Sequence, residues 1–367
     1  MDLRNAIAGC MIGGAVGDAL GAPVEFNSIA AIRAGFGPAG VTSYAEFTDG
    51  RGAFTDDTQM ALFTAEGALR AYHRSEISGT EPEVPAALYR SYLRWLRTQE
   101  GPAPAAGRAA LVHGERGESG WLMEEPLLYR RRAPGTTCLA ALRSGRMGTP
   151  EKPINNSKGC GGIMRVAPIP LLFRGERFPA DRVLSLGCAS AAITHGHPSG
   201  YWSAGCLGLI LHHILLGCPL REAVAEACGS ILPFPGHEET LAAVRNGIEA
   251  AGRKHFTPED LEEIGGGWTG EEALGISVAC ALRFHDDFEA GVLSAVNHSG
   301  DSDSTGSITG NILGLLLGRR AISSELIDNL EGVSIVEEVA DDLFIGMRGS
   351  ADSPDAEWLG KYPCVDP

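Results

Sequence analysis

Residues 2–21 read DLRNAIAGCMIGGAVGDALG and set the pattern that most of the chain repeats. Asp2 is a residue suited to cap a helix, and behind it the apolar positions Leu3, Ile7 and Cys10 recur at three- and four-residue spacing. The stretch ends near Gly21, where a helix is expected to stop. We predict a buried helix here, rich in glycine.

The same helical period recurs along the chain, while strict alternation of apolar and polar residues is nearly absent. The further helical stretches are residues 56–72, 86–96, 181–194, 202–216, 220–231, 238–251, 271–284, 288–295 and 305–317. So many helices with so little strand signal predict an all-α fold.

Glycine is unusually frequent inside these predicted helices. The chain has 49 glycines, and Gly13, Gly14, Gly208, Gly310 and Gly314 are among those within helical stretches. Glycine costs about 1 kcal/mol relative to alanine in a helix interior. Its repeated use predicts close packing of helix backbones in a large core.

Length, charge and cysteine content restrict the class of protein. A chain of 367 residues allows one large domain or two small ones. The formal net charge of -16 disfavours nucleic acid as a partner, because the phosphate backbone would be repelled. The 9 cysteines contain no C-x-x-C pair and are expected to be reduced thiols. Neither a signal peptide nor a membrane span is recognisable, so we expect a cytoplasmic protein.

Two acidic clusters each stand at the start of a predicted helix: Thr55-Asp56-Asp57-Thr58 and Asp301-Ser302-Asp303-Ser304. Taken singly, each has an ordinary explanation, since threonine caps helices and aspartate is favourable in a first helical turn. Four carboxylates brought together would repel unless cations lay between them. Carboxylate and hydroxyl oxygens are the ligands that Mg²⁺ and Mn²⁺ prefer.

The combination of the two clusters therefore predicts a divalent-metal-dependent hydrolase, in which two bound cations activate water. An EF-hand loop is the competing interpretation, because Asp301, Asp303 and Gly306 match the opening of that motif. The twelfth position of the loop is Ile312, where the EF-hand requires a bidentate glutamate. The EF-hand is excluded on this ground.

A glycine-rich stretch, residues 155–162, reads NNSKGCGG. Its glycines allow consecutive backbone N–H groups to converge on an anion such as a phosphate. It matches neither the P-loop nor the dinucleotide-binding fingerprint, so no standard nucleotide fold follows. A plain turn explains the spacing equally well.

Five motifs in order along residues 9–318 resemble the ADP-ribosylglycohydrolases. They are Gly13–Gly21 with Glu25, Phe54–Thr58, Gly159–Arg165, Thr194–Pro198 and Gly300–Ser304. The resemblance implies a single compact orthogonal helical domain, residues 1–345, followed by a C-terminal tail, residues 346–367. It also implies metal-dependent removal of ADP-ribose from a modified protein side chain, most often arginine.

The resemblance further assigns roles to residues. Glu25 and Asp303 are the implied catalytic residues, and two Mg²⁺ or Mn²⁺ ions are the implied cofactors. The implied metal ligands are Thr55, Asp56, Asp57, Asp301, Asp303 and Ser304. The implied substrate-binding residues are Ser157, Gly159, Cys160, Gly161, Gly162 and His195. The implied partners are an ADP-ribosylated protein and ADP-ribose, while the net charge and the short apolar runs lead us to expect neither nucleic acid nor a membrane.

Several of these residues also have ordinary structural explanations. Asp18 lies within an apolar helix, where a structural hydrogen bond accounts for a buried carboxylate. Glu25 follows Pro23 closely and can be a solvated loop acid. His195 and His197 flank a turn at the end of a helical stretch, where imidazoles commonly cap a helix.

Two other functions fit the same sequence. The first is a binding or immunity protein, which would recognise ADP-ribose or block an ADP-ribosylating toxin sterically without turnover. The second is a two-metal phosphohydrolase, which would release inorganic phosphate from a small phosphorylated substrate. Product analysis separates both from a glycohydrolase.

Overall fold

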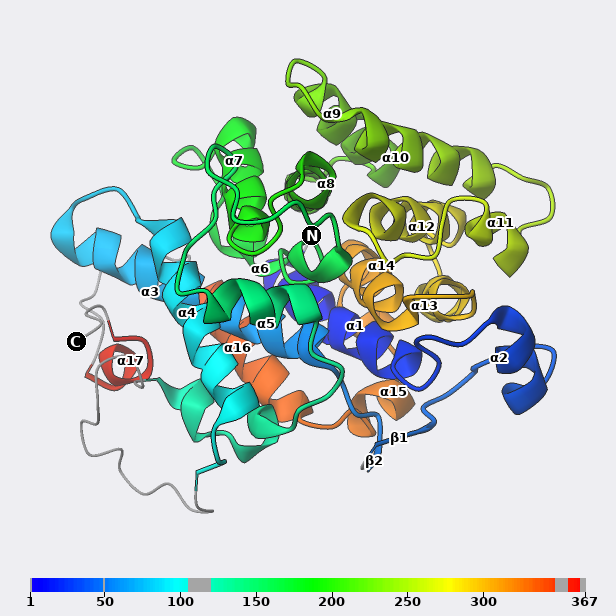
Figure 1. Cartoon of the computed structure of the whole chain (residues 1–367), viewed down its shortest axis with the longest axis horizontal. Helices are drawn as coiled ribbons and strands as arrows, with labels where there is room; N and C mark the ends of the chain where they lie inside the picture. The colour runs from blue at the N-terminus through cyan, green and yellow to red at the C-terminus, as the bar shows by residue number, and fades with distance from the viewer. Residues whose placement is uncertain (1, 49, 105–119, 347–355, 364–367) are drawn as a thin grey trace.

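The first helix and a helix near the end of the sequence lie side by side at the centre of the molecule (Figure 1). The structure is a computed structural model and describes residues 2–48, 50–104, 120–346 and 356–363. In it α1 (Leu3–Gly21) packs antiparallel along α14 (Ser302–Leu317). All but the first few residues of α1 are buried or nearly so, because neighbouring helices cover it on several sides.

The α1–α14 contact is closer than ordinary side chains allow. A Cβ atom at Gly13 would lie 2.4 Å from the carbonyl oxygen of Gly310, and one at Gly17 would lie 2.0 Å from that of Gly306. The predicted close packing of helix backbones is confirmed at these positions. It is wrong for Gly208, where an added Cβ would meet no atom within 4 Å.

The remaining helices surround this central pair. Their bounds are α2 Ile29–Phe36, α3 Asp56–Ser78, α4 Val84–Glu100, α5 Thr136–Arg143, α6 Pro168–Leu172, α7 Ala180–Ala192, α8 Pro198–Leu215, α9 Leu220–Ile231, α10 Glu238–Ala251, α11 Pro258–Glu262, α12 Gly270–Arg283, α13 Phe288–Val296, α15 Ser324–Asp328, α16 Val333–Gly346 and α17 Ala356–Lys361. Short 3₁₀ helices span Trp121–Glu124, Pro126–Tyr129, Cys160–Gly162 and Arg319–Ala321.

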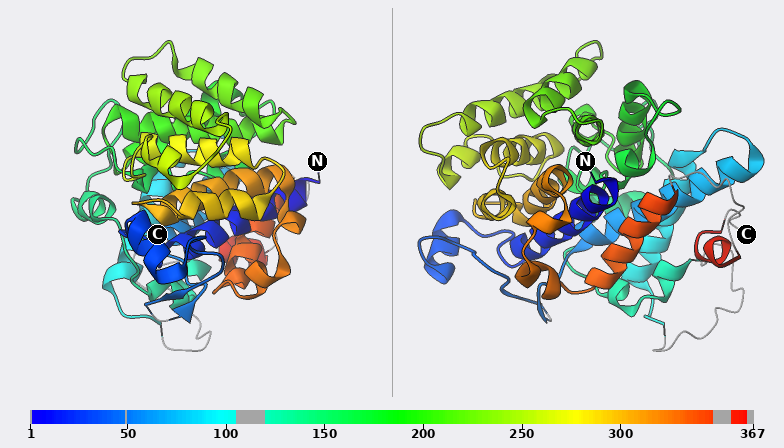
Figure 2. Two further views of the ribbon diagram at one scale, coloured as in Figure 1. Left: turned by 90° about the vertical axis from the view of Figure 1, so that its right-hand side faces the viewer. Right: turned by 180° about the vertical axis from the view of Figure 1, so that it is seen from behind.

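These helices form two groups around α1 and α14. On one side α8, α10 and α12 pack together, and on the other α3 packs with α4, α6 and α16 (Figures 1 and 2). Most of the buried apolar side chains of both groups belong to one large hydrophobic cluster, and a smaller cluster lies among α10, α11, α12 and α13. The acidic segments that follow α1 and precede α3 and α14 therefore lie between the two groups.

The predicted all-α fold is confirmed. Every predicted helical stretch overlaps a helix of the structure, and within the described residues the strands are limited to one antiparallel hairpin, β1 (Glu46–Phe47) with β2 (Gly50–Arg51). α14 begins at Ser302, earlier than the predicted residue 305, which brings Asp303 into its first turn. In the described part of the chain no helix is both long and apolar enough to cross a bilayer.

The described residues that follow α16 contact the helical core. α16 runs through the predicted boundary at residue 345, and residues 347–355 and 364–367 of the predicted tail, including Cys364, lie outside the described residues. In the described part, Tyr362 is buried and its hydroxyl donates to Oδ2 of Asp342 at 2.6 Å. The division into domain and tail stays a prediction. The eight described cysteines are all free thiols, as expected.

Candidate active site

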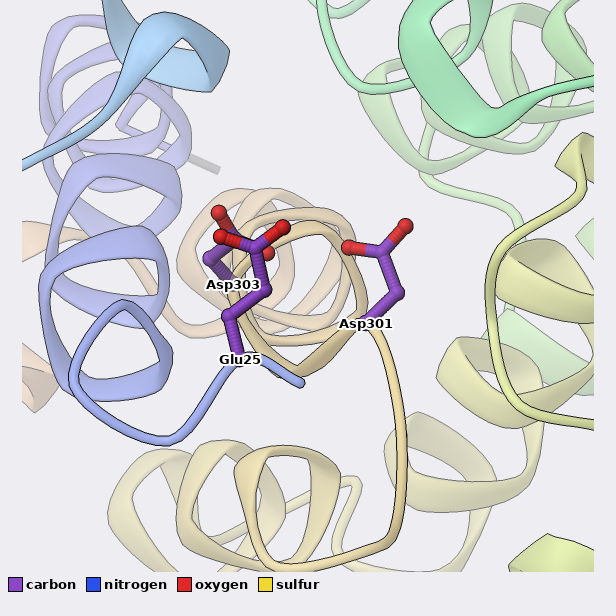
Figure 3. Close-up of side chains that lie close together, drawn as sticks. All are labelled: Glu25, Asp301 and Asp303. Atoms are coloured by element: carbon purple, nitrogen blue, oxygen red, sulfur yellow. The ribbon is translucent and has the colours of Figure 1, made fainter. Parts of the chain in front are cut away.

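The starts of α3 and α14 meet, and the two acidic clusters form one group. The hydroxyl of Thr55 donates to Oδ2 of Asp303 at 3.3 Å. Glu25 joins them because the close α1–α14 contact continues to Gly21, where an added Cβ would lie 2.2 Å from the Ser302 carbonyl oxygen. Carboxylate oxygens of Glu25, Asp301 and Asp303 lie within 4.8 Å of one another, and Figure 3 shows the three side chains on the same side of the α14 start.

Helix capping explains only part of this cluster. Thr55 is the N-cap of α3, and its Oγ1 accepts from the amide of Asp57 at 3.3 Å. Asp301 stands at the N-cap of α14, but its side chain makes no capping hydrogen bond there. Its Oδ2 instead accepts from Sγ of Cys160 at 2.8 Å. Capping therefore accounts for Thr55 at the start of α3. It does not account for the Asp301 carboxylate at the start of α14.

Asp18 holds the start of α3 in place from a neighbouring helix. Its carboxylate accepts from the amides of Thr55 and Thr58, each at 3.0 Å, and from the Thr58 hydroxyl at 2.5 Å. Asp18 is fully buried, and these donors satisfy a charge that would otherwise be costly. The predicted structural hydrogen bond is confirmed, and through it α1 orients the acidic end of α3.

The cluster has strongly perturbed acidity. Burial and then the charges of Asp303 and Asp301 raise the pKa of Glu25 to about 10. Burial, followed by the charge of Asp303, raises the pKa values of Asp57 and Asp301 well above the usual range of aspartate. The pKa values rise because these buried groups repel one another when ionised, and nearby positive charge is too little to offset that repulsion. Clusters of this kind concentrate at functional sites.

The residues fit a pair of divalent cations. Oδ2 of Asp57 is buried and has no hydrogen-bond partner among the described residues, an arrangement that is rare for a polar atom unless something else binds it. The neighbouring donors are carboxylate and hydroxyl oxygens, the set that Mg²⁺ and Mn²⁺ prefer. Cations would relieve the repulsion that raises the pKa values and would satisfy the orphaned oxygen.

The glycine-rich loop is bound to the segment that precedes α12. The amide of Cys160 donates to the carbonyl of Trp268 at 3.1 Å, and the amide of Gly270 donates to the carbonyl of Lys158 at 2.8 Å. The Cys160 amide is thus occupied within the protein and does not join a row of free amides. Ser157 shapes the loop, since its Oγ accepts from the Gly159 amide at 3.3 Å.

His195 lies directly against this loop. Burial, and then the charge of Arg165, lowers the pKa of His195 to about 3, so the ring is neutral at pH 7. The guanidinium of Arg165 donates to Oγ1 of Thr194 at 2.7 Å, and the same Oγ1 shares a hydrogen bond with Nδ1 of His195 at 2.9 Å. Nε2 of the ring lies beside Gly159. His197 has a different role, because its Nδ1 accepts from the amide of Ser199 and caps α8.

A cavity of about 310 Å³ joins the acidic cluster to the glycine-rich loop. The predicted site residues that line it are Glu25, Asp56, Asp57, Gly159, Cys160, Gly161, His195, Asp301, Asp303 and Ser304. Thr55, Ser157 and Gly162 are outside this lining. Thr55 reaches the cluster through Asp303, whereas an added Cβ at Gly162 would lie 2.8 Å from Ala191, which places that glycine against α7.

Sequence reasoning missed one wall of the cavity and one edge. The wall is residues 133–138, and its Gly135 amide donates to Oδ2 of Asp56 at 3.0 Å. The edge is formed by Phe26 and Trp268. The signal for the wall was the unusual run of residues 130–135, RRRAPG, but nothing in that run indicates which helix start it contacts. Only the fold brings it to α3.

These features define a class of protein: an all-α fold in which buried carboxylates from two helix starts meet at a cavity beside a glycine-rich loop. The chain belongs to the ADP-ribosylglycohydrolase family, whose model matches residues 1–353. Membership supports an ADP-ribosyl hydrolase activity, and the family expected from the sequence motifs is confirmed.

Individual relatives are distant but match over four fifths of their length or more. The chain is 26% identical to the ADP-ribosyl-[dinitrogen reductase] glycohydrolase of Rhodospirillum rubrum, over 90% of this chain and 91% of that one. It is 25% identical to the ADP-ribosylarginine hydrolase Tri1 of Pseudomonas putida (strain GB-1), over 96% and 81%. A solved structure described as an ADP-ribosylglycohydrolase-related protein complex superposes with a TM-score of 0.67 at 24% identity, over 94% of this chain and 99% of that one. This last match supports the fold alone.

Proposed function

We propose that this protein is a divalent-metal-dependent hydrolase that removes ADP-ribose from arginine side chains of modified proteins. The observation that carries the proposal is the cluster of the half-buried Glu25 with the buried Asp57, Asp301 and Asp303, which has no lysine or arginine partner among the described residues and opens into a cavity. The names of two relatives, which mention dinitrogen reductase and arginine as the modified groups, support the choice of a protein-linked ADP-ribose.

The residues that would hold two Mg²⁺ or Mn²⁺ ions are Thr55, Asp56, Asp57, Asp301, Asp303 and Ser304. When bound, such ions would polarise substrate oxygens and lower the pKa of a coordinated water. In the overall reaction the bond between the anomeric ribose carbon and the arginine nitrogen breaks, water supplies a hydroxyl to that carbon, and the leaving guanidine nitrogen takes a proton.

The protein's own residues would position the substrate and move the proton. Glu25 lies in the cavity beside Asp303, where its carboxyl group can exchange a proton with the group that leaves the ribose. Nε2 of His195 and the backbone of Gly161 line the other part of the cavity and would hold the diphosphate, beside Gly159, whose amide is bound to Ser157. Burial of the cluster excludes bulk water from these contacts.

The experiment is incubation of the purified protein with three substrates that carry ADP-ribose on arginine, on serine, or on thymine in DNA. Each is tested with Mg²⁺, with Mn²⁺ and with a chelator, and products are identified by mass spectrometry. We expect free ADP-ribose from the arginine-linked substrate in the presence of metal, and none with the chelator. Inorganic phosphate as product would instead support a phosphohydrolase, and protection of the substrate only at stoichiometric amounts would support a binding protein.

Asp303→Ala is the matching variant, and we expect it to abolish release of ADP-ribose while the circular dichroism spectrum stays helical. Asp341→Ala is the control, because Asp341 is exposed and pairs on the surface with Arg4 at 2.7 Å. Full activity of Asp303→Ala at saturating Mg²⁺ would refute the metal assignment.

A further inference from the structure

Two stacked aromatic side chains stand at the edge of the cavity. The rings of Phe26 and Trp268 have centroids 5.0 Å apart and planes 26° from parallel. Phe26 is 71% exposed, the most exposed of the described large apolar side chains, and Trp268 is 41% exposed. Both line the cavity. One face of Phe26 rests on Trp268, which leaves the other available to a ligand.

Core packing does not account for this phenylalanine. Its backbone has a φ of 69°, in the left-handed region that side chains other than glycine and asparagine seldom adopt. The conformation is held by the loop before α14, since the Phe26 amide donates to the Gly300 carbonyl at 3.2 Å and the Gly300 amide donates to Asn27 at 3.3 Å. A strained backbone that holds an exposed aromatic ring at a cavity edge is typical of a binding residue.

The charge of the cavity indicates what this ring would meet. The ionisable residues of the lining are five carboxylates, two thiols and the neutral His195, and neither lysine nor arginine lines the cavity among the described residues. Five acidic side chains face the cavity and no cationic side chain of the described residues balances them, so the lining favours a positively charged ligand. A planar cation gains from both the acidic field and the face of an aromatic ring.

Phe26 directly follows Glu25 in the chain and lines the same cavity, so it stands next to the residue to which the proposed function assigns proton transfer with the leaving acceptor. We propose that Phe26, supported from behind by Trp268, stacks on the guanidinium group of the ADP-ribosylated arginine and selects cationic acceptors. This inference rests on the proposed function, since it assumes an arginine-linked substrate. It assigns to Phe26 a role in specificity for the acceptor, apart from binding of the nucleotide.

The test compares Phe26→Ala, Phe26→Leu and Phe26→Tyr. Each replacement keeps a Cβ atom, so all three variants have the same backbone strain at this positive φ as the parent protein. We measure kcat/KM for an arginine-linked ADP-ribosyl peptide and, by calorimetry, the Kd of free ADP-ribose. Loss of one cation–π contact is worth about a tenfold change. We expect kcat/KM to fall about that much in Phe26→Ala and Phe26→Leu, mainly through KM, and to be restored in Phe26→Tyr. The Kd of ADP-ribose should stay within about twofold of the parent value.

Phe234→Ala is the matched control, because Phe234 is 45% exposed and stacks on Trp202 at 5.2 Å but does not line the cavity. It should leave both measurements unchanged. Three results would overturn the inference. An equal loss of ADP-ribose affinity in Phe26→Ala would assign the ring to the nucleotide, and full activity of Phe26→Leu would show that no aromatic ring is needed. A fall in kcat alone that Phe26→Tyr does not restore would indicate a positioning role toward Glu25. If the parent protein does not cleave the arginine linkage at all, the proposed function itself fails, a result distinct from these three.

Discussion

The helix α3 carries buried carboxylates at two places about 15 Å apart along its axis, and their surroundings are opposite in charge. Near the middle of the helix, Glu66 is fully buried and contacts Arg70 and Arg94, each at 2.9 Å. At the N-terminal end, Asp56 and Asp57 are equally buried and meet further carboxylates of α14.

The acidity of the two groups reflects this difference. Burial alone would raise the pKa of Glu66, but Arg94, Arg70 and the Ser91 hydroxyl together hold it below the usual value of glutamate. At the helix start burial has no such counterweight, and the pKa values of Asp56 and Asp57 rise well above the usual range. The comparison teaches that Glu66, which has its own counterions, stabilises the core, whereas a cluster of carboxylates without them has the perturbed acidity that is common at functional sites.

The largest effect is expected at the uncompensated group. Asp57→Asn preserves shape but removes a carboxylate that a cation would bind, so we expect hydrolysis to slow on the order of ten-thousandfold, about 5.4 kcal/mol. Because one of several repelling charges is lost, the metal-free variant should unfold at the same temperature as the parent or higher. Activity and thermal unfolding in chelator are the two measurements. A variant that unfolds several kcal/mol more easily without metal would place Asp57 in a structural network and remove the contrast with Glu66.

The opposite outcome is expected at Glu66. Glu66→Gln removes the buried carboxylate that Arg70 and Arg94 both contact, and breaking a buried ion pair costs about 3–5 kcal/mol of folding free energy. Chemical unfolding measures this loss. Any protein that remains folded should keep its activity per molecule, because Glu66 lies outside the cavity lining. Loss of activity with unchanged stability would contradict the structural assignment.

Addition of metal sharpens the comparison further. Mg²⁺ that binds only the folded state stabilises it by about 2.7 kcal/mol at a concentration of 100 times Kd. We expect the parent protein and Glu66→Gln to gain this stability in a titration of the unfolding temperature, and Asp57→Asn to gain much less. An equal gain in Asp57→Asn, or none in the parent, would show that the cluster is not the binding site.

How far these distinctions can be predicted from sequence depends on the range of the interactions. The 3.6-residue period predicts most helices, and glycine at every fourth position of α1 and α14 signals their close contact. α16 was missed although its buried residues Ile335, Val339 and Leu343 keep the same period, and α6 was missed because it has only five residues and two prolines.

The candidate site shows the same limit. The sequence predicts that both acidic clusters stand at helix starts. It does not show whether a given carboxylate caps its helix or is free to bind something else. That distinction required the Asp301 side chain, which caps nothing in its own helix. The pairing of Gly135 with Asp56 and the stacking of Phe26 on Trp268 join residues far apart in the chain. Local periodicity carries no information about such contacts.

The smallest expected effect concerns one hydrogen bond of the compensated group. The hydroxyl of Ser91 lies 2.6 Å from Oε2 of Glu66 and 2.5 Å from the carbonyl oxygen of Phe63. Ser91→Ala removes this donor but leaves both arginines, so the folded state should lose only about 1–1.5 kcal/mol. Chemical unfolding of Ser91→Ala beside Glu66→Gln measures the two losses on one scale. A loss in Ser91→Ala as large as that in Glu66→Gln would mean that the hydroxyl, and not the pair of guanidinium groups, keeps the Glu66 charge stable in the core.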